Sequence, residues 1–257
     1  MDTFGTHRSD FLASIVVEHG PRNILARYFL AISWYLRERR LHLELISFPD
    51  LLDVNRRNRE SWLPLTPTFD VTVNADLTRC PAYVFAARTE SGDVVATHAS
   101  RLFNWERTSF HFEAETLRLF YADPTRQAVS QESCRVSAPS AKQIRGNVVY
   151  SGATWYHPSV RGLGLPGVLS PFNRAYALSQ WPVDTFTGLV SEANVNRNFA
   201  QRAHHANWEH GVLCRCSTHG DVDYYLVWST PDAVVAGCES FITTNSNPLV
   251  AIDQRSA

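Results

Sequence analysis

The residues with the clearest chemical potential lie in the stretch Val160-Arg-Gly-Leu-Gly-Leu-Pro166. Glycines allow the backbone to come close to a ligand and leave several amide groups free to point towards it. Pro166 suits the first position of a helix, because proline has no amide hydrogen that would need a partner there. The positive end of that helix's dipole would face the same spot. The stretch therefore predicts an anion-binding turn suited to a pyrophosphate.

Two kinds of cofactor could use such a turn, and the first is a dinucleotide. Gly162, Gly164 and Gly167 match the pattern G-x-G-x-x-G, and Asp184 follows about 20 residues later, as in dinucleotide-binding folds. However, residues 157–161 stand between the preceding strand and the motif, and Asp184 begins the next expected strand instead of ending it. A dinucleotide-dependent oxidoreductase is therefore the more distant alternative.

The second kind of cofactor is an acyl-CoA. The run Arg161-Gly-Leu-Gly164-Leu-Pro166 resembles the Arg/Gln-x-x-Gly-x-Gly/Ala signature of the GNAT superfamily of acyl-CoA-dependent N-acyltransferases. It departs from that signature at Pro166, which replaces a small residue. His157-Pro158 and the residues after it also resemble the family's usual run into this turn. The order of expected elements agrees with the family over residues 68–230.

The resemblance implies an α/β (α+β) fold, in which a mixed, mostly antiparallel twisted sheet is flanked by helices. It also implies transfer of an acyl group from acetyl-CoA or another acyl-CoA to a small-molecule or peptide amine. The amine would attack the thioester directly. The first alternative is a non-catalytic GNAT-like module that binds acyl-CoA as a sensor or interaction domain.

By position, the resemblance assigns most cofactor contacts to the turn and to the strand before it. Backbone amides of the turn would bind the pyrophosphate, and backbone groups at the strand's end would pair with the pantetheine arm. An asparagine in the helix after the next strand would meet pantetheine as well. The implied cofactor-binding residues are Trp155, Tyr156, His157, Val160, Arg161, Gly162, Leu163, Gly164, Leu165, Pro166 and Asn198.

The implied catalytic residues depart from the family pattern. A tyrosine often protonates the leaving thiolate in this family, whereas here the corresponding helix offers His205, whose reference pKa lies near neutrality. Family members often carry a glutamate base in the strand before the turn, but residues 147–155 contain no carboxylate. Glu115 and Glu192 are the substitutes for that base. Positioning of the two substrates would also accelerate the reaction without a base.

The N-terminal part of the chain, which precedes all of these candidate residues, is expected to be helical. Apolar spacing predicts helices over residues 21–40 and 49–57, and two prolines in residues 62–68 prevent a helix from continuing there. We therefore expect an N-terminal helical extension, residues 1–65, packed on a GNAT-like acyl-CoA-binding domain, residues 66–257.

In that domain, apolar runs and turn residues predict mainly strands. The expected strands are residues 82–87, 94–98, 117–121, 147–155, 185–190, 212–216 and 224–228. Helices are expected over residues 166–179 and 196–208. Residues 122–143 are polar and irregular, and the segment after residue 231 shows no informative pattern.

Composition narrows the class of protein. The chain has 257 residues, of which 44% are hydrophobic and 19% charged, so it can bury a sizeable core and is not a disordered chain. With a net charge of −1, the chain has no excess of positive charge that would favour binding to nucleic acid or to an anionic membrane. The start of the chain lacks an apolar signal core, and residues 24–36 are too short and too charged to span a bilayer.

Cysteine usage points to a reducing compartment. The odd count of five cysteines argues against a secreted disulfide framework, so we expect a cytoplasmic protein. Histidines and cysteines gather in residues 204–219, but their spacing fits no standard zinc finger, and we expect no metal. We expect neither nucleic acid nor membrane as a partner, and the sequence leaves a homodimer open.

Overall fold

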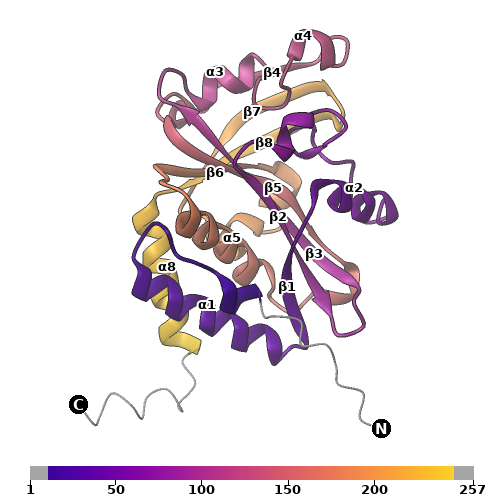
Figure 1. Ribbon diagram of the computed structural model, residues 1–257. Helices are drawn as coiled ribbons and strands as arrows, with labels where there is room; N and C mark the ends of the chain where they lie inside the picture. The colour runs from indigo at the N-terminus through magenta and orange to yellow at the C-terminus, as the bar shows by residue number, and fades with distance from the viewer. Residues whose placement is uncertain (1–10, 246–257) are drawn as a thin grey trace, which may run out of the picture.

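The structure is a computed structural model that describes residues 11–245. Within these residues, eight strands form one sheet in the order β1-β2-β3-β5-β6-β8-β7-β4 (Figure 1). The strands are β1 (Leu41–Ile46), β2 (Ala82–Thr89), β3 (Val94–Trp105), β4 (Ser133–Val136), β5 (Gly146–Tyr156), β6 (Thr185–Ser191), β7 (Asn207–Ser217) and β8 (Gly220–Ser229). Of the strand pairs described, β5–β6 alone is parallel, so the predicted mixed, mostly antiparallel sheet is confirmed.

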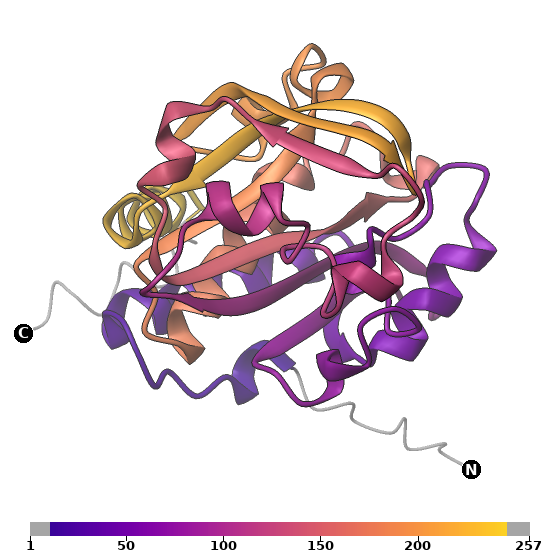
Figure 2. The same cartoon turned by 90° about the horizontal axis from the view of Figure 1, so that it is seen from above.

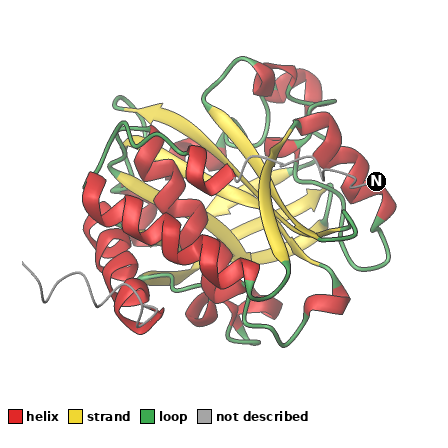
Figure 3. Cartoon of the chain, turned by 60° about the horizontal axis from the view of Figure 1, so that its bottom comes forward, coloured by secondary structure: helices red, strands yellow, loops and turns green. Residues whose placement is uncertain are grey.

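Helices flank both faces of this sheet. The α-helices are α1 (Arg22–Arg37), α2 (Phe48–Arg57), α3 (Phe110–Glu115), α4 (Pro124–Gln127), α5 (Pro166–Gln180), α6 (Glu192–Val195), α7 (Phe199–Arg202) and α8 (Pro231–Asn245). Short 3-10 turns are η1 (Phe11–Ser14), η2 (Pro67–Phe69), η3 (Ala75–Thr78), η4 (Pro139–Lys142) and η5 (Pro158–Val160). Helices α1, α5 and α8 pack together on one face (Figure 3).

Each face of the sheet has its own apolar core. On the α5 face, α1 contributes Leu25, Ile32 and Leu36, whose helical spacing places them on one buried stripe. On the other face, α2 contributes Leu51 to a core that also contains Phe69. The central strands lie between the two cores, and this fixes which side chains of β5 face which helix layer.

The N-terminal helices are found where the sequence predicts them, as α1 and α2. A reciprocal capping box between Ser47 and Asp50 starts α2. Between these helices, however, β1 pairs with β2 and forms one edge of the main sheet. The segment 1–65 therefore contributes a strand as well as helices, and a domain boundary at residue 65 stays a prediction.

Two secondary-structure predictions before β5 were wrong. Residues 117–121 form tight turns after α3 instead of a strand, because Leu117 adopts a left-handed φ of 61° and its carbonyl accepts from the Tyr121 amide. The segment 122–143, expected to be irregular, contains the four-residue strand β4, which pairs with β7 at the sheet edge. So short a strand leaves little alternating pattern to detect.

Two further differences follow β6. Of the helix predicted over residues 196–208, only the single turn α7 forms, because Asn198 adopts a left-handed φ of 60° and β7 already begins at Asn207. A separate turn, α6, lies just before the predicted range. In the segment after residue 231, for which no pattern was expected, the described residues up to Asn245 form the helix α8, and the rest lie outside the described residues. The helix was detectable, since Thr230 precedes a first-turn proline and Val234, Cys238 and Ile242 follow at helical spacing.

Candidate functional site

The parallel strands β5 and β6 separate part of the way along. They pair over four positions, from Val148↔Thr185 to Ser151↔Gly188, and then the pairing stops although both strands continue. Residues 148–150 of β5 are buried, whereas residues 151–154 are half-exposed. We call residues 152–156 the open edge, because on the β6 side no described strand pairs with this part of β5.

A β-bulge explains why β5 turns away. Ala153 and Thr154 of β5 together oppose the single residue His98 of β3, and Ala153 has a left-handed φ of 47°. Such a bulge bends the strand and increases its twist. At the point of separation the strands are close, because a Cβ at Gly188 would lie 3.0 Å from the Ser151 carbonyl oxygen. The strands thus pack tightly up to Ser151 and diverge immediately after it.

The open edge leads into the glycine-rich turn and then into α5. Gly162 and Gly164 have left-handed φ values of 83° and 68°, and a Cβ at either position would meet nothing within 4 Å. Among the hydrogen bonds of the described residues, none has the amide of Gly162, Gly164 or Leu165 as donor. Leu165 is fully buried, so the amides that a ligand can reach are those of Gly162 and Gly164, which are exposed. They precede the positive end of the α5 dipole, and the turn therefore has the features of an anion site.

The first turn of α5 also receives the segment that follows α7. A Cβ at Gly167 would lie 3.1 Å from the Arg202 carbonyl oxygen and 3.4 Å from the Nε2 atom of His204. Arg174 holds this segment, since its Nη2 atom donates to the carbonyls of Ala203 and His204 at 2.8 and 2.9 Å. The glycine thus lets the His204 ring lie against the start of α5.

Arg174 dominates the electrostatics beside α5. Its side chain is buried, and no ion pair is found for it among the described residues. Burial lowers its pKa to about 10, so the guanidinium stays charged. Burial and then the charge of Arg174 lower the pKa of half-buried His205 well below its usual value. His205 is therefore a neutral imidazole at pH 7, and its role as an acid stays a prediction.

The other two predicted catalytic residues lie elsewhere. Glu192 is exposed at the end of β6 and lines a hollow of about 410 Å³ together with Arg215 and Asp223. Glu115 is hydrogen-bonded to the edge strand β4, since its Oε1 atom accepts from the Val136 amide at 3.0 Å. The structure therefore places Glu115, Glu192 and His205 in three different surroundings.

Glu115 also lies at the wrong end of β5 to meet the turn. Its helix α3 is joined to the start of β5, where the Phe110 amide donates to the Ile144 carbonyl at 3.0 Å. The strand then advances through ten steps before it reaches Tyr156, which at the usual rise is roughly 30 Å. Contact with a ligand at the glycine-rich turn is therefore not supported for Glu115.

The predicted cofactor-binding residues fall into two groups. Those from Trp155 to Pro166 form one continuous path along the end of β5, η5 and the turn. Asn198 lies outside this stretch of chain, exposed at the start of α7, and its carbonyl accepts from the Arg202 amide at 3.1 Å. The structure thus brings the strand and the turn together, and the role of Asn198 stays a prediction.

A buried polar chain, which sequence reasoning missed, underlies the bulge. The His98 Nε2 atom lies 2.8 Å from the Tyr156 hydroxyl, and its Nδ1 atom lies 3.3 Å from the Thr154 hydroxyl. The Tyr156 hydroxyl also lies 3.4 Å from that of Ser170 on α5. Burial lowers the pKa of His98 to about 3 and keeps the ring neutral. Thr154 of the bulge and Tyr156 are thereby held to one histidine, and Tyr156 connects this chain to α5.

On the opposite face, a segment crosses from one side of the separation to the other. The Trp62 ring stacks on Trp155 of β5, with centroids 5.2 Å apart and planes 9° apart. Further along, the Pro64 carbonyl lies 2.6 Å from the Nε2 atom of His219, in the β7–β8 turn. Residues 61–65, which we call the strap, thus connect the end of β5 with the β7–β8 hairpin (Figure 2).

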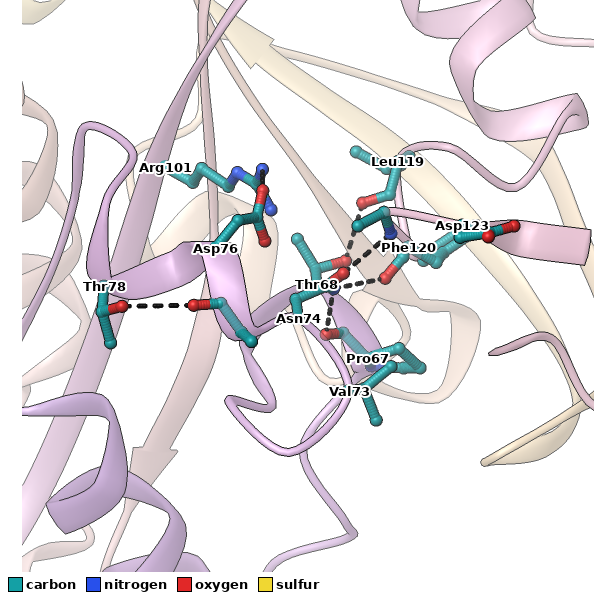
Figure 4. A network of polar contacts seen from close by, with 12 residues as sticks. Pro67, Thr68, Val73, Asn74, Asp76, Thr78, Arg101, Leu119, Phe120 and Asp123 are labelled. Carbon is teal, nitrogen blue, oxygen red and sulfur yellow. Dashed lines mark hydrogen bonds and ion pairs between the residues drawn. The ribbon is translucent and has the colours of Figure 1, made fainter. Parts of the chain in front are cut away.

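A second buried network of hydrogen bonds holds residues 67–69, which follow the strap in the chain. The Asn74 amide nitrogen donates to the carbonyls of Pro67 and Phe120 at 2.6 and 2.8 Å, and its oxygen accepts from the Ala122 amide (Figure 4). This anchors the turn η2, whose Phe69 ring packs where a side chain at Gly152 would otherwise lie. Nothing in the sequence marks Asn74, because two of its three partners, Phe120 and Ala122, lie more than 40 residues away.

Within the described residues, the structure lacks two features expected of a dinucleotide-binding fold, a mostly parallel sheet and the predicted acidic residue close to the glycine-rich turn. Dinucleotide-binding folds are built on a mostly parallel sheet, whereas here a single described pair is parallel. Asp184, the acid expected to meet a ribose, accepts instead from the Asn147 amide at 2.8 Å, at the start of β5. That position is at the opposite end of the strand from the glycine-rich turn.

Solved structures similar to this chain include three complexes. NAA60 of Arabidopsis thaliana with acetyl-CoA is 15% identical, with a TM-score of 0.44, and covers 74% of this chain and 98% of its own. Spermidine N-acetyltransferase of Vibrio cholerae with CoA and spermine is 10% identical, with a TM-score of 0.44 and coverages of 77% and 99%. Aminoglycoside acetyltransferase AAC(6')-Ib with coenzyme A and kanamycin is 14% identical, with a TM-score of 0.40 and coverages of 75% and 96%.

No protein-family model matches this sequence, and no curated protein is similar to it in sequence. Between residues 11 and 245, no group of three or more His, Cys, Asp or Glu side chains is placed so that it could hold a metal ion. None of the helices in that range is long and apolar enough to cross a membrane.

Proposed function

We propose that this chain binds an acyl-CoA and transfers its acyl group, in the simplest case acetyl, to an amine. The observation that carries this proposal is the continuity of the open edge with the glycine-rich turn. A strand edge free on one side leads directly to the exposed, free amides of Gly162 and Gly164 before α5.

The two parts fit the two chemically different halves of coenzyme A. The pantetheine arm carries amides, which would pair with the backbone of Trp155 and Tyr156 as an added strand would. His157, also predicted to pair there, already uses its amide on the Val95 carbonyl and its carbonyl on the Val160 amide. The pyrophosphate would take the amides of Gly162 and Gly164, whose missing side chains leave that surface open. Both sites lie on one stretch of chain, so a single extended ligand would occupy them together.

Acyl-CoA would supply a thioester, and the chain would supply position and a proton acceptor. Glu192 is exposed at the end of β6 and would take the proton of the incoming amine. His205, as a neutral imidazole, and Asn198, beside α7, are the remaining candidates near the cofactor. Much of the acceleration would come from holding amine and thioester together.

The acceptor would be a small-molecule or peptide amine. The similar spermidine and aminoglycoside enzymes were solved with spermine and with kanamycin, respectively. The strap and the β7–β8 turn cover the face of the separation opposite α5 and would form the wall that the acceptor meets. A cytoplasmic location and a homodimer stay predictions.

An acyl-CoA sensor without turnover is the second candidate. It is favoured by the absence of any carboxylate from β5 and by the neutral state of His205. Release of free CoA in the presence of a panel of amines, amino acids and peptides separates the two functions. Binding of acetyl-CoA without thiol release from any of them would favour the sensor.

The cofactor assignment is tested by calorimetry with CoA and acetyl-CoA on the unaltered protein and on the variant Gly164→Val. We expect the variant to bind about tenfold or more weakly, since the valine side chain would occupy the approach to the free amides. Gly92→Val is the matched control, because Gly92 also has a left-handed φ, 91°, and open space around its Cβ position. It lies in the β2–β3 turn, outside the separation of β5 and β6.

The control separates backbone strain from ligand crowding. Both valines must adopt an unfavourable left-handed backbone, so both variants should lose stability to a similar extent. Only Gly164→Val should lose affinity for CoA. Equal affinities in the two variants, or no heat of binding from the unaltered protein at millimolar CoA, would overturn the assignment.

A further inference from the structure

Two buried cysteines face each other across the sheet edge, far from the glycine-rich turn. Cys134 of β4 and Cys214 of β7 are directly opposite in the antiparallel register. Each side chain is 5% exposed. Neither residue takes part in the proposed acyl-CoA site.

The pairing type at this position follows from the neighbouring hydrogen bonds. The Ser137 amide donates to the Gly211 carbonyl at 2.8 Å, which marks a hydrogen-bonded pair just beyond the end of β4. Hydrogen-bonded and non-hydrogen-bonded pairs alternate along an antiparallel ladder. Three residues back along β4, Cys134 therefore forms a non-hydrogen-bonded pair with Cys214.

A second bond supports this alternation. The Val136 amide donates to the Glu115 carboxylate, outside the ladder, as an amide at a non-hydrogen-bonded position must. Non-hydrogen-bonded partners have Cα atoms about 4.5 Å apart, and their side chains lie closest. Disulfides span Cα separations of about 4.4–6.8 Å. A bond between the two sulfurs thus needs no rearrangement of the strands.

The two thiols are also chemically unequal. The hydrogen bond from the Cys134 thiol to the Cys214 sulfur lowers the pKa of Cys214 and raises that of Cys134. The thiolate is the nucleophile in thiol oxidation. Cys214 therefore reacts first, and Cys134 stands next to it as the second thiol.

We propose that Cys134 and Cys214 form an intramolecular disulfide when the folded protein meets a hydroperoxide such as hydrogen peroxide. The Cys214 thiolate attacks one peroxide oxygen, the O–O bond breaks, and the hydroxide released takes the Cys134 proton to form water. The Cys134 thiolate then attacks the Cys214 sulfenic acid, forming the S–S bond. The hydroxide that leaves takes a proton from solvent and becomes the second water. Two thiols are oxidised and one peroxide is reduced.

Brief opening of the sheet edge gives the oxidant access. β4 has four residues and pairs on one side with β7 alone among the described strands, and such short edge elements open locally at low free-energy cost. The disulfide would tie this strand covalently to the sheet. We therefore expect the oxidised protein to have a higher Tm and an unchanged affinity for CoA.

The arrangement of arginines makes the bond easy to map. Trypsin cuts after Arg126, Arg135, Arg202 and Arg215, so Cys134 falls in peptide 127–135 and Cys214 in peptide 203–215. The full-length protein is treated with hydrogen peroxide under native conditions, the peroxide is removed, free thiols are blocked with excess N-ethylmaleimide while the protein is unfolded, and the digest is analysed without reduction. The expected result is one cross-linked peptide, two hydrogens lighter than the sum of its parts.

One variant that removes a proposed disulfide partner, and one control variant at a neighbouring cysteine, test the proposal further. Cys134→Ser should abolish both the cross-link and the rise in Tm, whereas Cys216→Ser, at the exposed neighbouring cysteine, should preserve both. Mapping in the unaltered protein decides the matter even if Cys134→Ser does not fold. Blocked thiols at both Cys134 and Cys214 after peroxide, oxidation confined to Cys216, or any other pairing would overturn the proposal.

Discussion

At the scale of single residues, the backbone of Ala153 sets the shape of the candidate site. Its left-handed φ of 47° is part of the bulge that turns β5 away from β6. An alanine in this conformation costs roughly 1–2 kcal/mol relative to an ordinary backbone. The chain thus maintains a locally unfavourable geometry at the point where the open edge begins.

Replacing Ala153 tests whether that strain is present. Ala153→Gly should be neutral or stabilising, since glycine adopts this φ freely, and Ala153→Val should lose at least about 1 kcal/mol of unfolding free energy. Urea denaturation measures both. The control is Ala236→Gly in the exposed part of α8, where glycine should cost roughly 1 kcal/mol. A loss at Ala153→Gly as large as in the control would contradict the left-handed assignment.

His98 makes stability depend on pH. Its folded pKa of about 3 lies below the unfolded value of 6.5, so the unfolded chain binds the proton more readily between these values. The contribution of His98 is therefore complete above pH 6.5 and is lost as the pH falls towards 3. Between pH 7 and pH 5 this amounts to about 2 kcal/mol.

The variant His98→Gln removes this titration and leaves the other ionisable groups in place. Urea denaturation at pH 7 and at pH 5 should show a smaller loss of unfolding free energy for the variant than for the unaltered protein. The two losses should differ by about 2 kcal/mol. Equal losses would mean that His98 is not buried as a neutral ring.

At the scale of elements, the strap closes one face of the separation between β5 and β6. Its Trp62 ring lies flat on Trp155, an arrangement that contributes about 0.5–1.5 kcal/mol beyond burial alone. We expect Trp62→Ala to release residues 61–65, and hydrogen exchange of their amides to become faster. Trp34→Ala, at an exposed position on α1, should leave that exchange unchanged. Unchanged exchange in Trp62→Ala would show that the stacking does not hold the strap.

Elements defined by local signals could be predicted from the sequence. The turn before α5 needs glycines at its left-handed positions and tolerates Pro166 at the helix start, and all of these are visible in one short stretch. The separation of β5 from β6 has no such local signal. Its cause, two residues of β5 opposite His98, depends on which strands pair and leaves no local mark.

The candidate catalytic residues were the least predictable part for the same reason. Glu115 has the right chemistry, but its place is set by long-range pairing of α3 with the edge strand β4. Phe69 and Asn74 support the site through contacts distant in sequence, and neither belongs to a motif. Side chains of this kind are found only once the topology is known.

At the scale of the whole molecule, the layers place the candidate site where the sheet is interrupted. Helices α1, α5 and α8 cover one face with a continuous core, and α2 with the turns after it covers the other (Figure 1). Between them β5 and β6 diverge, so one central strand has a free edge inside an otherwise paired sheet. Open α/β architectures place ligands where neighbouring strands part.

The central claim is that CoA lies along this free edge and reaches the glycine-rich turn. Titration of the isotope-labelled protein with CoA, followed by amide NMR, tests it residue by residue. The largest shifts should occur at Gly162, Gly164 and Leu165, followed by residues 152–156. No shifts at millimolar CoA, or shifts centred on the hollow beside Glu192 with the turn unaffected, would contradict the claim.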